Sequence, residues 1–231
     1  MTDTVYPAIA CIIPAAGIGQ RMQAGKPKQY LSLQGKTILE HSVARLAAIP
    51  SLGPIWLVLA ADDAYFDATP LAQSTVTRVK GGAERMHSVL NALHFIDEHQ
   101  YPWVLVHDAA RPLVRQSDIS LLLQRCIDTG HGGILACRVR DTMKRGERYV
   151  SETVDREHLW HALTPQLFPT ALLKAALRDA ISQGIAVTDE ASAMEWARHT
   201  VLLVEGRSDN IKITQPTDLA LAAFYLEQMA E

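Results

Sequence analysis

Cysteine and long apolar runs are both scarce in this 231-residue chain, and each scarcity excludes a class of protein. The three cysteines, Cys11, Cys126 and Cys137, form no C-x-x-C pair, so neither a disulfide framework nor a zinc knuckle is indicated. The apolar stretch 8–16 is interrupted by Pro14 and is too short to cross a membrane or to direct export. We therefore expect a reducing, cytoplasmic location.

The chain also lacks a strong charge of either sign. Its formal net charge of -3 gives no electrostatic reason to expect nucleic acid or a membrane as the main partner. An anionic ligand must therefore be bound by local basic residues. No internal repeat, low-complexity tract or long linker interrupts the chain, and 48% of its residues are hydrophobic. We expect residues 1–231 to form one domain around one core.

Short apolar runs alternate with longer segments of helical period, which is typical of βαβ units. The expected strands are residues 9–13, 55–60, 75–79, 103–106, 133–139 and 201–204. The expected helices are residues 37–49, 84–96, 117–128, 170–183, 189–198 and 218–229, the third with Ser117 as its cap and Gly130 as its stop. Because the strand runs are almost continuously apolar, we predict a Rossmann-like α/β fold whose mostly parallel sheet carries helices on both faces.

One segment breaks this rhythm. Residues 140–156 are strongly charged, contain a turn-like Arg145-Gly146 pair and end in an alternating stretch, 149–154. Alternation between side chains of different character is typical of a strand that is not buried on both faces. We predict a projecting β-hairpin arm.

The loop after the first strand contains Gly17, Gly19, Arg21 and, a little further on, Lys28. Small residues let backbone N–H groups approach an anion, and the carboxyl end of a strand is where α/β folds bind phosphate. The loop matches neither the P-loop pattern nor G-x-G-x-x-G, and a tight turn flanked by two solvated cations is the plain alternative. The added Arg and Lys favour phosphate binding.

Two further strands are followed by acidic residues. Asp108 comes directly after the strand 103–106, and Asp209 follows the strand 201–204. Magnesium is bound by one or two carboxylates together with substrate phosphates, so this pair predicts a magnesium site, although a turn-capping role is a common alternative. We interpret His107 as a structural neighbour of Asp108 and not as a base.

A glycine pair, Gly81-Gly82, opens the predicted helix 84–96. Gly82 and Ala83 would offer backbone groups to a flat base, with Ser88 one turn further on. An ordinary helix start explains these residues equally well. The neighbouring motifs make base recognition the better interpretation.

At these residues the chain resembles the 2-C-methyl-D-erythritol 4-phosphate cytidylyltransferases, over segments that span nearly its whole length. The resemblance implies transfer of CMP from CTP to methylerythritol phosphate, with release of pyrophosphate, in non-mevalonate isoprenoid biosynthesis. It implies that Arg21 and Lys28 stabilise charge on the α-phosphate, and that Asp108 and Asp209 contact magnesium, with manganese as the alternative metal. The implied nucleotide-binding residues are Ala15, Ala16, Gly17, Gly19, Gly82, Ala83 and Ser88.

The resemblance also implies a homodimer in which the arm, residues 138–158, crosses to the second subunit. The residues then expected around methylerythritol phosphate are Arg111, Thr142, Arg156, Thr188 and Lys212. Two positions depart from the family pattern. Gln20 replaces an arginine found in some members, a loss that Lys26 could offset, and Ala83 replaces an acidic residue.

Other functions compete with this one. Within the same class, the acceptor could be another polyol phosphate such as ribitol 5-phosphate. A nicotinamide-dependent oxidoreductase requires the G-x-G-x-x-G pattern, which the first loop lacks. A nucleotide sensor without catalysis would need only the phosphate-binding loop. The presence of Lys28, Asp108 and Asp209 together favours a catalytic function.

Overall fold

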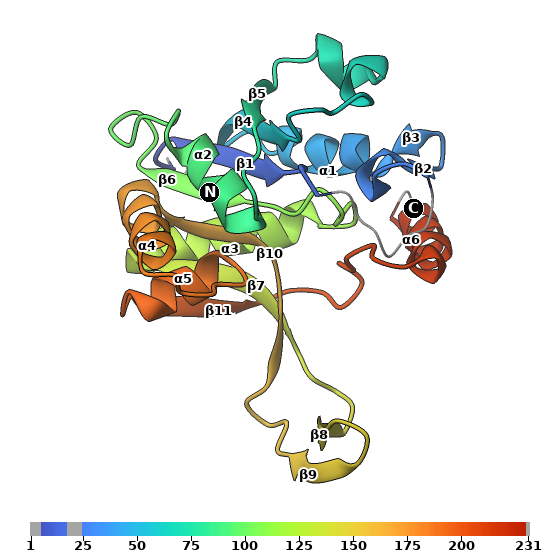
Figure 1. The fold of residues 1–231 in the computed structure, drawn as a ribbon, viewed down its shortest axis with the longest axis vertical. Helices are drawn as coiled ribbons and strands as arrows, with labels where there is room; N and C mark the ends of the chain where they lie inside the picture. Colours follow the sequence, from blue (N-terminus) through green and yellow to red (C-terminus); the bar gives the residue numbers. More distant parts are fainter. Residues whose placement is uncertain (1–5, 18–24, 230–231) are drawn as a thin grey trace, which may run out of the picture.

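The computed structural model describes residues 6–17 and 25–229, and its centre is a seven-stranded sheet (Figure 1). The strand order is β11-β7-β10-β6-β1-β4-β5. The strands are β1 (Ile9–Pro14), β4 (Leu52–Leu59), β5 (Thr77–Lys80), β6 (Trp103–Val106), β7 (Gly132–Arg138), β10 (Trp160–Pro169) and β11 (Val201–Glu205). Every pairing in this sheet is parallel except those of β10. The predicted mostly parallel sheet is confirmed.

Strand β10 lies antiparallel between β6 and β7, and the sequence analysis did not predict it. Its middle contains Thr164, Pro165 and Gln166, which give neither an apolar run nor a regular alternation. Its pairing with β7 is irregular between Ala162 and Gln166, where Pro165 cannot donate a ladder hydrogen bond. The same irregular stretch brings polar side chains to the end of β6.

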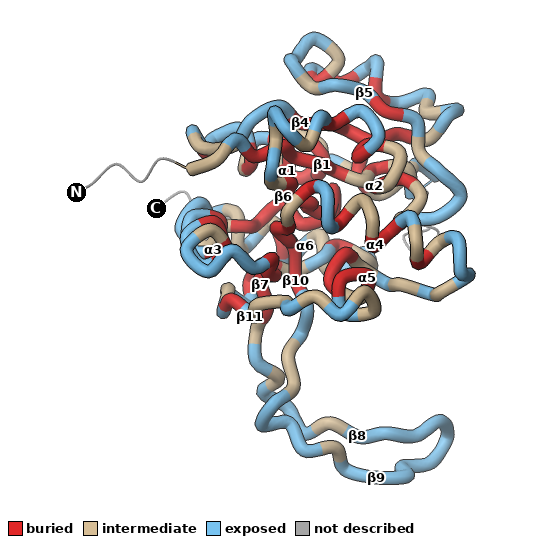
Figure 2. Tube along the Cα trace, turned by 90° about the vertical axis from the view of Figure 1, so that its left-hand side faces the viewer, coloured by how far each residue is buried: buried red, intermediate tan, exposed pale blue. Residues whose placement is uncertain are grey.

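Helices cover both faces of the sheet, as predicted, and β1 shows why. Ile9, Cys11 and Ile13 point to one face, where they pack with α1 (Ile38–Ala47) and α3 (Gln116–Thr129). The intervening Ala10 and Ile12 point to the other face. There they pack with α2 (Arg85–Leu93), α4 (Thr170–Ser182) and α5 (Glu190–Trp196). Figure 2 shows the buried residues concentrated in these layers.

Several helix ends follow the capping chemistry of the sequence, whereas α2, α3 and α4 begin without a side-chain cap. Thr37 and Asp189 cap α1 and α5 in reciprocal capping boxes, and Gly130 ends α3 in the left-handed conformation at φ 69°. The prediction that Ser117 caps α3 is wrong. The helix already begins at Gln116, and the Ser117 hydroxyl lies near the Asp118 carboxylate instead.

A third apolar cluster joins α6 (Pro216–Gln228) to the hairpin of β2 (Ser32–Leu33) and β3 (Lys36–Thr37). Ile213 belongs to this cluster, so the chain between β11 and α6 is anchored beside the end of β6. The described residues also form the short 3-10 helices η2 (Lys28–Tyr30), η3 (Phe66–Ala68) and η4 (Pro70–Gln73). No helix in the described part of the chain is long and apolar enough to cross a membrane.

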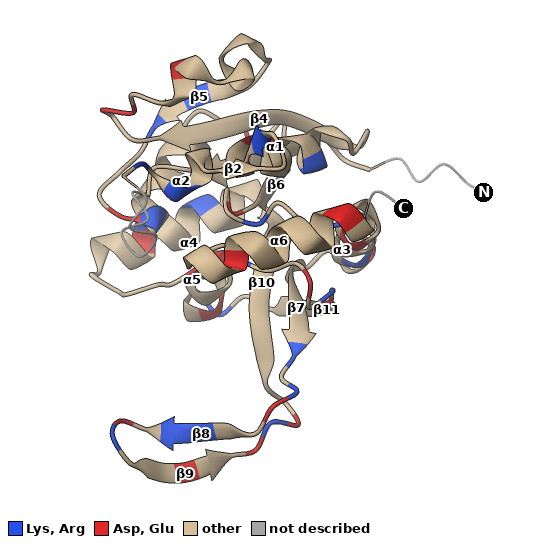
Figure 3. Ribbon diagram, turned by 90° about the vertical axis from the view of Figure 1, so that its right-hand side faces the viewer, with Lys and Arg blue, Asp and Glu red and all other residues tan. Residues whose placement is uncertain are grey.

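The predicted arm is present and projects from the body of the molecule (Figures 1 and 2). It consists of β8 (Met143–Gly146) and β9 (Val150–Val154), which pair only with each other in an antiparallel ribbon. The turn comprises residues 147–149, so Arg145 and Gly146 end a strand and do not form the turn. Arg145 on β8 lies opposite Glu152 on β9, and Figure 3 shows the basic colour on β8 and the acidic colour on β9.

Candidate active site

A pocket opens where β1 and β6 end, between the loop after β1, the start of α2 and the segment before α6. It is lined by Pro14, Ala15, Ala16, Gly17, Lys28, Gln29, Gly82, Ala83, Glu84, Arg85, Ser88, Asp108, Ala109, Ala110 and Lys212. The carboxyl ends of parallel strands are the usual ligand site of open α/β sheets. Six of the seven residues predicted to bind the nucleotide line this pocket. The seventh, Gly19, and the predicted catalytic Arg21 lie outside the described residues, as does Gln20.

The glycine pair brings two walls of the pocket together. A Cβ atom at Gly81 would lie 2.5 Å from the Cβ of Ala16, and one at Gly82 would lie 2.4 Å from the Cβ of His87. The backbone N–H of Gly82 donates to the hydroxyl of buried Ser88 at 3.1 Å. These close approaches leave a narrow slot walled by small residues and backbone, beside the charged side chains that line the rest of the pocket, and such a slot suits a flat base.

Lys28 and Gln29 enter the pocket from η2. The Nζ of Lys28 donates to the carbonyl of Ile213 at 3.1 Å, which places the ammonium beside the segment that carries Lys212. Gln29 is buried and donates to the carbonyl of Ala15 at 2.6 Å, so it fixes the path of the loop after β1. Sequence reasoning gave Lys28 a role but passed over Gln29.

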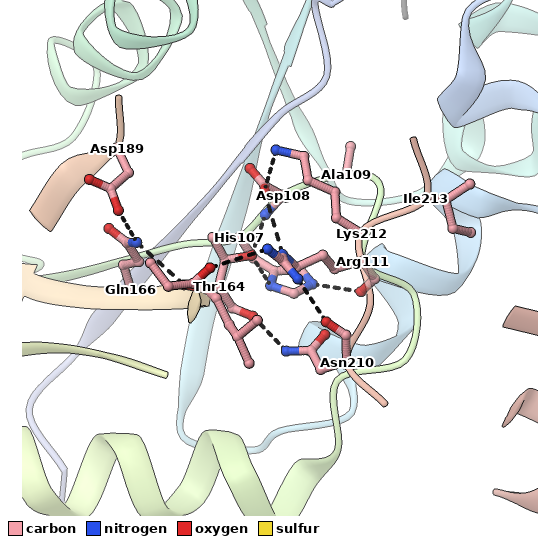
Figure 4. Close-up of polar contacts among 12 residues, drawn as sticks. His107, Asp108, Ala109, Arg111, Thr164, Gln166, Asp189, Asn210, Lys212 and Ile213 are labelled. Carbon is pink, nitrogen blue, oxygen red and sulfur yellow. Dashed lines mark hydrogen bonds and ion pairs between the residues drawn. The ribbon is translucent and has the colours of Figure 1, made fainter. Parts of the chain in front are cut away.

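Asp108 stands on the pocket floor among three cations (Figure 4). Its carboxylate lies 2.8 Å from the Nζ of Lys212, 3.2 Å from Arg85 and 3.6 Å from the Nε of Arg111. Burial by itself would raise the pKa of Asp108, but Arg85, Lys212 and Arg111 together hold it well below its usual range. Asp108 is therefore a permanent anion at neutral pH.

A buried hydrogen-bond network of His107 and Thr164 fixes the backbone of Asp108 (Figure 4). The Nε2 of His107 donates to the carbonyl of Arg111 at 2.9 Å, so its Nδ1 accepts from the Thr164 hydroxyl at 3.1 Å. The same hydroxyl accepts from the backbone N–H of Asp108 at 3.0 Å. Burial lowers the pKa of His107 to about 4, so the ring is neutral at physiological pH. The interpretation of His107 as a structural neighbour is confirmed.

Asp209, the other predicted magnesium ligand, is not among the residues that line the pocket. Its carboxylate accepts from the Nη2 of Arg115 at 3.2 Å and from the Nε of Arg207 at 3.0 Å. Within the described residues, no group of three or more His, Cys, Asp or Glu side chains could hold a metal ion. A magnesium ion fits this chemistry only if substrate phosphates supply most of its ligands, with Asp108 as the carboxylate in the pocket.

Of the residues predicted to surround the acceptor, one lines the pocket and the others do not. Lys212 lines the pocket, whereas Arg111 is buried beneath it and donates to the carbonyl of Asn210 at 2.7 Å. Thr188 is exposed just before α5. Thr142 and Arg156 are exposed at the root of the arm, where Arg156 donates to the carbonyl of Arg140.

Sequence reasoning missed two charged residues at this site. Arg85 lines the pocket and contacts both Asp108 and the buried Glu190 of α5. Both residues lie in segments that the resemblance covers, but single-sequence reasoning had no signal that they meet, because 104 residues separate them along the chain. A charged residue on the buried side of a predicted helix, as at Glu190, is the one available hint.

Comparison with known proteins gives a consistent result. The sequence model of the 2-C-methyl-D-erythritol 4-phosphate cytidylyltransferase family matches residues 9–228. The enzyme of that name from Pseudoalteromonas translucida is 53% identical over 225 residues, which cover 97% of this chain and 93% of the relative. The one from Pseudoalteromonas atlantica is 55% identical over 227 residues, with 97% of each chain covered.

The fold agrees with the sequence comparison. The crystal structure of the Francisella tularensis 2-C-methyl-D-erythritol 4-phosphate cytidylyltransferase superposes with a TM-score of 0.81 at 36% identity. The match covers 94% of this chain and 99% of that one. A family match over most of the chain, relatives above 50% identity and a shared fold lead to one assignment: the chain belongs to the 2-C-methyl-D-erythritol 4-phosphate cytidylyltransferase family.

Proposed function

We propose that this chain transfers CMP from CTP to 2-C-methyl-D-erythritol 4-phosphate and so forms 4-diphosphocytidyl-2-C-methyl-D-erythritol and pyrophosphate. The observation that carries the proposal is the pocket at the ends of β1 and β6. It combines a narrow backbone-lined slot with Lys28, Lys212 and a buried, ionised Asp108, in a chain that belongs to this family. We infer that residues 1–231 act as one nucleotidyltransferase domain.

The reaction needs alignment and charge compensation more than proton transfer. A phosphate monoester has a second pKa of about 6, so the acceptor phosphate is mostly dianionic at neutral pH and attacks without a general base. Its oxygen forms a bond to the α-phosphorus of CTP while the bond to the bridging oxygen breaks and pyrophosphate leaves. The pocket agrees with this chemistry, since Asp108 is held by three cations and His107 is buried behind it.

The cations of the chain then perform the remaining tasks. Lys28 and Lys212 both line the pocket, where fixed positive charge would offset the repulsion between two anionic substrates and the charge that develops on the α-phosphate. Arg21 would act with them. When bound, magnesium or manganese would neutralise phosphate charge, and Asp108 is the residue of the pocket that would hold the metal.

We infer that the arm completes the acceptor site of a second copy of the chain, in a homodimer. Its strands pair only with each other, and its tip exposes 79% of Tyr149 and 64% of Val150. Thr142 and Arg156 would then contact methylerythritol phosphate in the partner's pocket, beside Thr188 and Lys212 of that pocket. A cytoplasmic location stays a prediction from the sequence.

Pyrophosphate release tests this function directly. The chain is mixed with CTP and magnesium and with methylerythritol phosphate, ribitol 5-phosphate or no acceptor, and each mixture is repeated with a chelator. Release that requires methylerythritol phosphate is the expected result. Release with ribitol 5-phosphate alone would move the assignment to another polyol phosphate, and CTP binding without release in any mixture would contradict catalysis.

A further inference from the structure

Glu190 is a fully buried carboxylate outside the set of residues that line the pocket, yet it contacts one of them. It is the first residue of α5 and has 0% exposure. Its Oε1 accepts from the Nη1 of Arg85 at 2.6 Å and its Oε2 from the Nη2 at 3.0 Å. Two parallel bonds of this kind fix both the position and the plane of a guanidinium.

Arg85 passes this restraint on to Asp108. Its Nε donates to the Oδ1 of Asp108 at 3.2 Å, whereas the Oδ2 of Asp108 lies 2.8 Å from the Nζ of Lys212. A continuous chain of charge-assisted contacts thus runs from α5 through α2 to the pocket floor and Lys212. The Nη2 of Arg85, which Glu190 binds, also lies 3.2 Å from the Oδ1 of Asp108, so the plane that Glu190 fixes sets how the guanidinium meets that carboxylate.

The backbone around Glu190 is itself held rigidly. The preceding residue, Asp189, caps α5 and accepts from the side chain of Gln166 at 2.8 Å (Figure 4). The other end of that amide accepts from the backbone N–H of Ala191 at 3.0 Å. These bonds attach the start of α5 to β10, so the carboxylate of Glu190 is presented to Arg85 from a fixed position.

Stability alone does not account for an ion pair at this place. Buried ion pairs are often no more stabilising than apolar residues of similar volume, because desolvation of two charges offsets their attraction. The surrounding layer is apolar, with Val89 and Leu93 of α2 and Ala191 and Met194 of α5 in one cluster. An apolar pair would pack in such a layer, but it would not orient Asp108.

We propose that Glu190 is a positioning residue for nucleotidyl transfer, which acts through Arg85 to orient the carboxylate of Asp108 in the pocket. The proposal rests on the proposed function. With Glu190 in place, Arg85 contacts the Oδ1 of Asp108 and leaves the Oδ2 to Lys212 and Arg111. Without it, the guanidinium loses the two bonds that fix its plane, and its contact no longer holds the Asp108 carboxylate in place beside Lys212.

The test is Glu190→Gln, which keeps the side-chain volume but faces one Arg85 nitrogen with a second donor. Turnover should fall by roughly 10- to 100-fold, the scale for losing an outer partner that orients a ligand. Calorimetric titration with CTP should still show the wild-type number of binding sites and an undiminished affinity, since the pocket loses no positive charge. Glu195→Gln, an exposed position on the same helix, is the matched control and should match the wild type in both measurements.

A double-mutant cycle separates positioning from a purely structural role. If Glu190 acts through Asp108, Glu190→Gln should have little further effect in an Asp108→Asn background. The proposal is overturned if the effects of the two substitutions on turnover are additive, or if Glu190→Gln turns over at the wild-type rate. It is also overturned if Glu190→Gln loses turnover only in proportion to its loss of CTP-binding sites. An inactive wild-type chain would instead refute the proposed function itself.

A second variant keeps the test decisive if Glu190→Gln folds poorly. The double variant Arg85→Met with Glu190→Met removes both charges and leaves no unpaired one, so the fold should persist. We expect it to bind CTP but to turn over at least as slowly as Glu190→Gln. Near-wild-type turnover in this double variant would contradict the positioning role.

Discussion

The pocket and the arm both carry charged residues but hold them in opposite ways. In the pocket, Asp108 is 7% exposed and has three cationic neighbours, and Glu190 behind it is fully buried. In the arm, Arg145 and Glu152 face each other across an exposed ribbon that pairs only with itself. The charged groups of the pocket therefore have buried partners within one chain, whereas those of the arm stay exposed to solvent in the single chain.

Under the proposed function, the pocket and the arm act on different substrates. Charge compensation at CTP depends on groups that the fold of one chain already fixes, and electrostatic stabilisation of this kind works because it is arranged in advance. In the homodimer that we propose, recognition of the acceptor would depend partly on groups of the arm that a second chain supplies. Variants in the two regions should consequently change different kinetic constants.

The largest effect is expected in the pocket, from Lys28→Ala. Turnover should fall by roughly two powers of ten or more, the scale for losing one preorganised charge stabiliser. The measurement is steady-state pyrophosphate release at saturating CTP and methylerythritol phosphate. Lys36→Ala, which removes an exposed lysine from β3, is the control and should behave like the wild type. An unchanged rate in Lys28→Ala would remove Lys28 from the mechanism.

A smaller and more selective effect is expected at the arm. Arg156→Ala should raise the KM for methylerythritol phosphate about 10- to 100-fold, the value of one charged hydrogen bond, and leave the KM for CTP unchanged. Arg178→Ala, an exposed arginine of α4, should change neither constant. Equal increases in both KM values would mean that Arg156 does not act on the acceptor alone.

Mixed dimers sharpen the same prediction. One subunit carries Lys28→Ala and the other Arg156→Ala, so each possible active site receives a different combination of defects. If Arg156 acts across the interface, one site contains both defects and the other contains none, and about half of the activity returns. Little recovered activity would indicate that each arm serves its own chain.

The burial of His107 behind the pocket should make the free energy of unfolding depend on pH. The folded pKa of His107 is lowered to about 4 from an ordinary 6.5, so the unfolded chain binds more protons between these values. The stability that neutral His107 contributes is present above pH 6.5 and is lost as the pH falls towards 4, at up to about 1.4 kcal/mol per pH unit. Asp108 adds its own loss only below its ordinary 3.8.

Urea unfolding at several pH values measures this slope. His107→Asn should reduce the slope between pH 6.5 and 4, whereas His158→Gln, at an exposed position beside the arm, should keep it. An identical slope in His107→Asn and the wild type would mean that the ring is not held neutral by the fold.

The sequence was informative where a single physical rule determines structure. Continuous apolar runs located β1 and β6, because strands covered on both faces have no polar side to alternate with. Gly130 ended α3 as expected from its left-handed φ. Strand β10 was missed because its position depends on neighbours: Thr164 and Gln166 are polar in sequence but serve Asp108 and α5 in space.

The site shows the same limit. Residues in one contiguous loop, such as Gly82 and Ser88, were predicted together and do meet, since a helix start fixes their spacing. Asp108 and Asp209 follow different strands, and proximity of their carboxylates does not follow from that fact. The Asp209 carboxylate contacts Arg115 and Arg207. The Arg85–Glu190 pair joins the first residues of α2 and α5, and no local pattern encodes that meeting.

The smallest effect on the free energy of unfolding should come from Glu152→Ala in the arm. Exposed ion pairs contribute about 0–1 kcal/mol, so the free energy of unfolding should hardly change, and the pair should weaken further in high salt. Removing one partner of the buried Arg85–Glu190 pair, by contrast, should cost about 3–5 kcal/mol. Urea denaturation of Glu152→Ala and Glu190→Ala, at low and high ionic strength, measures both. A large loss in Glu152→Ala would show that this side of the arm is buried in the assembled protein, where a second copy would cover it.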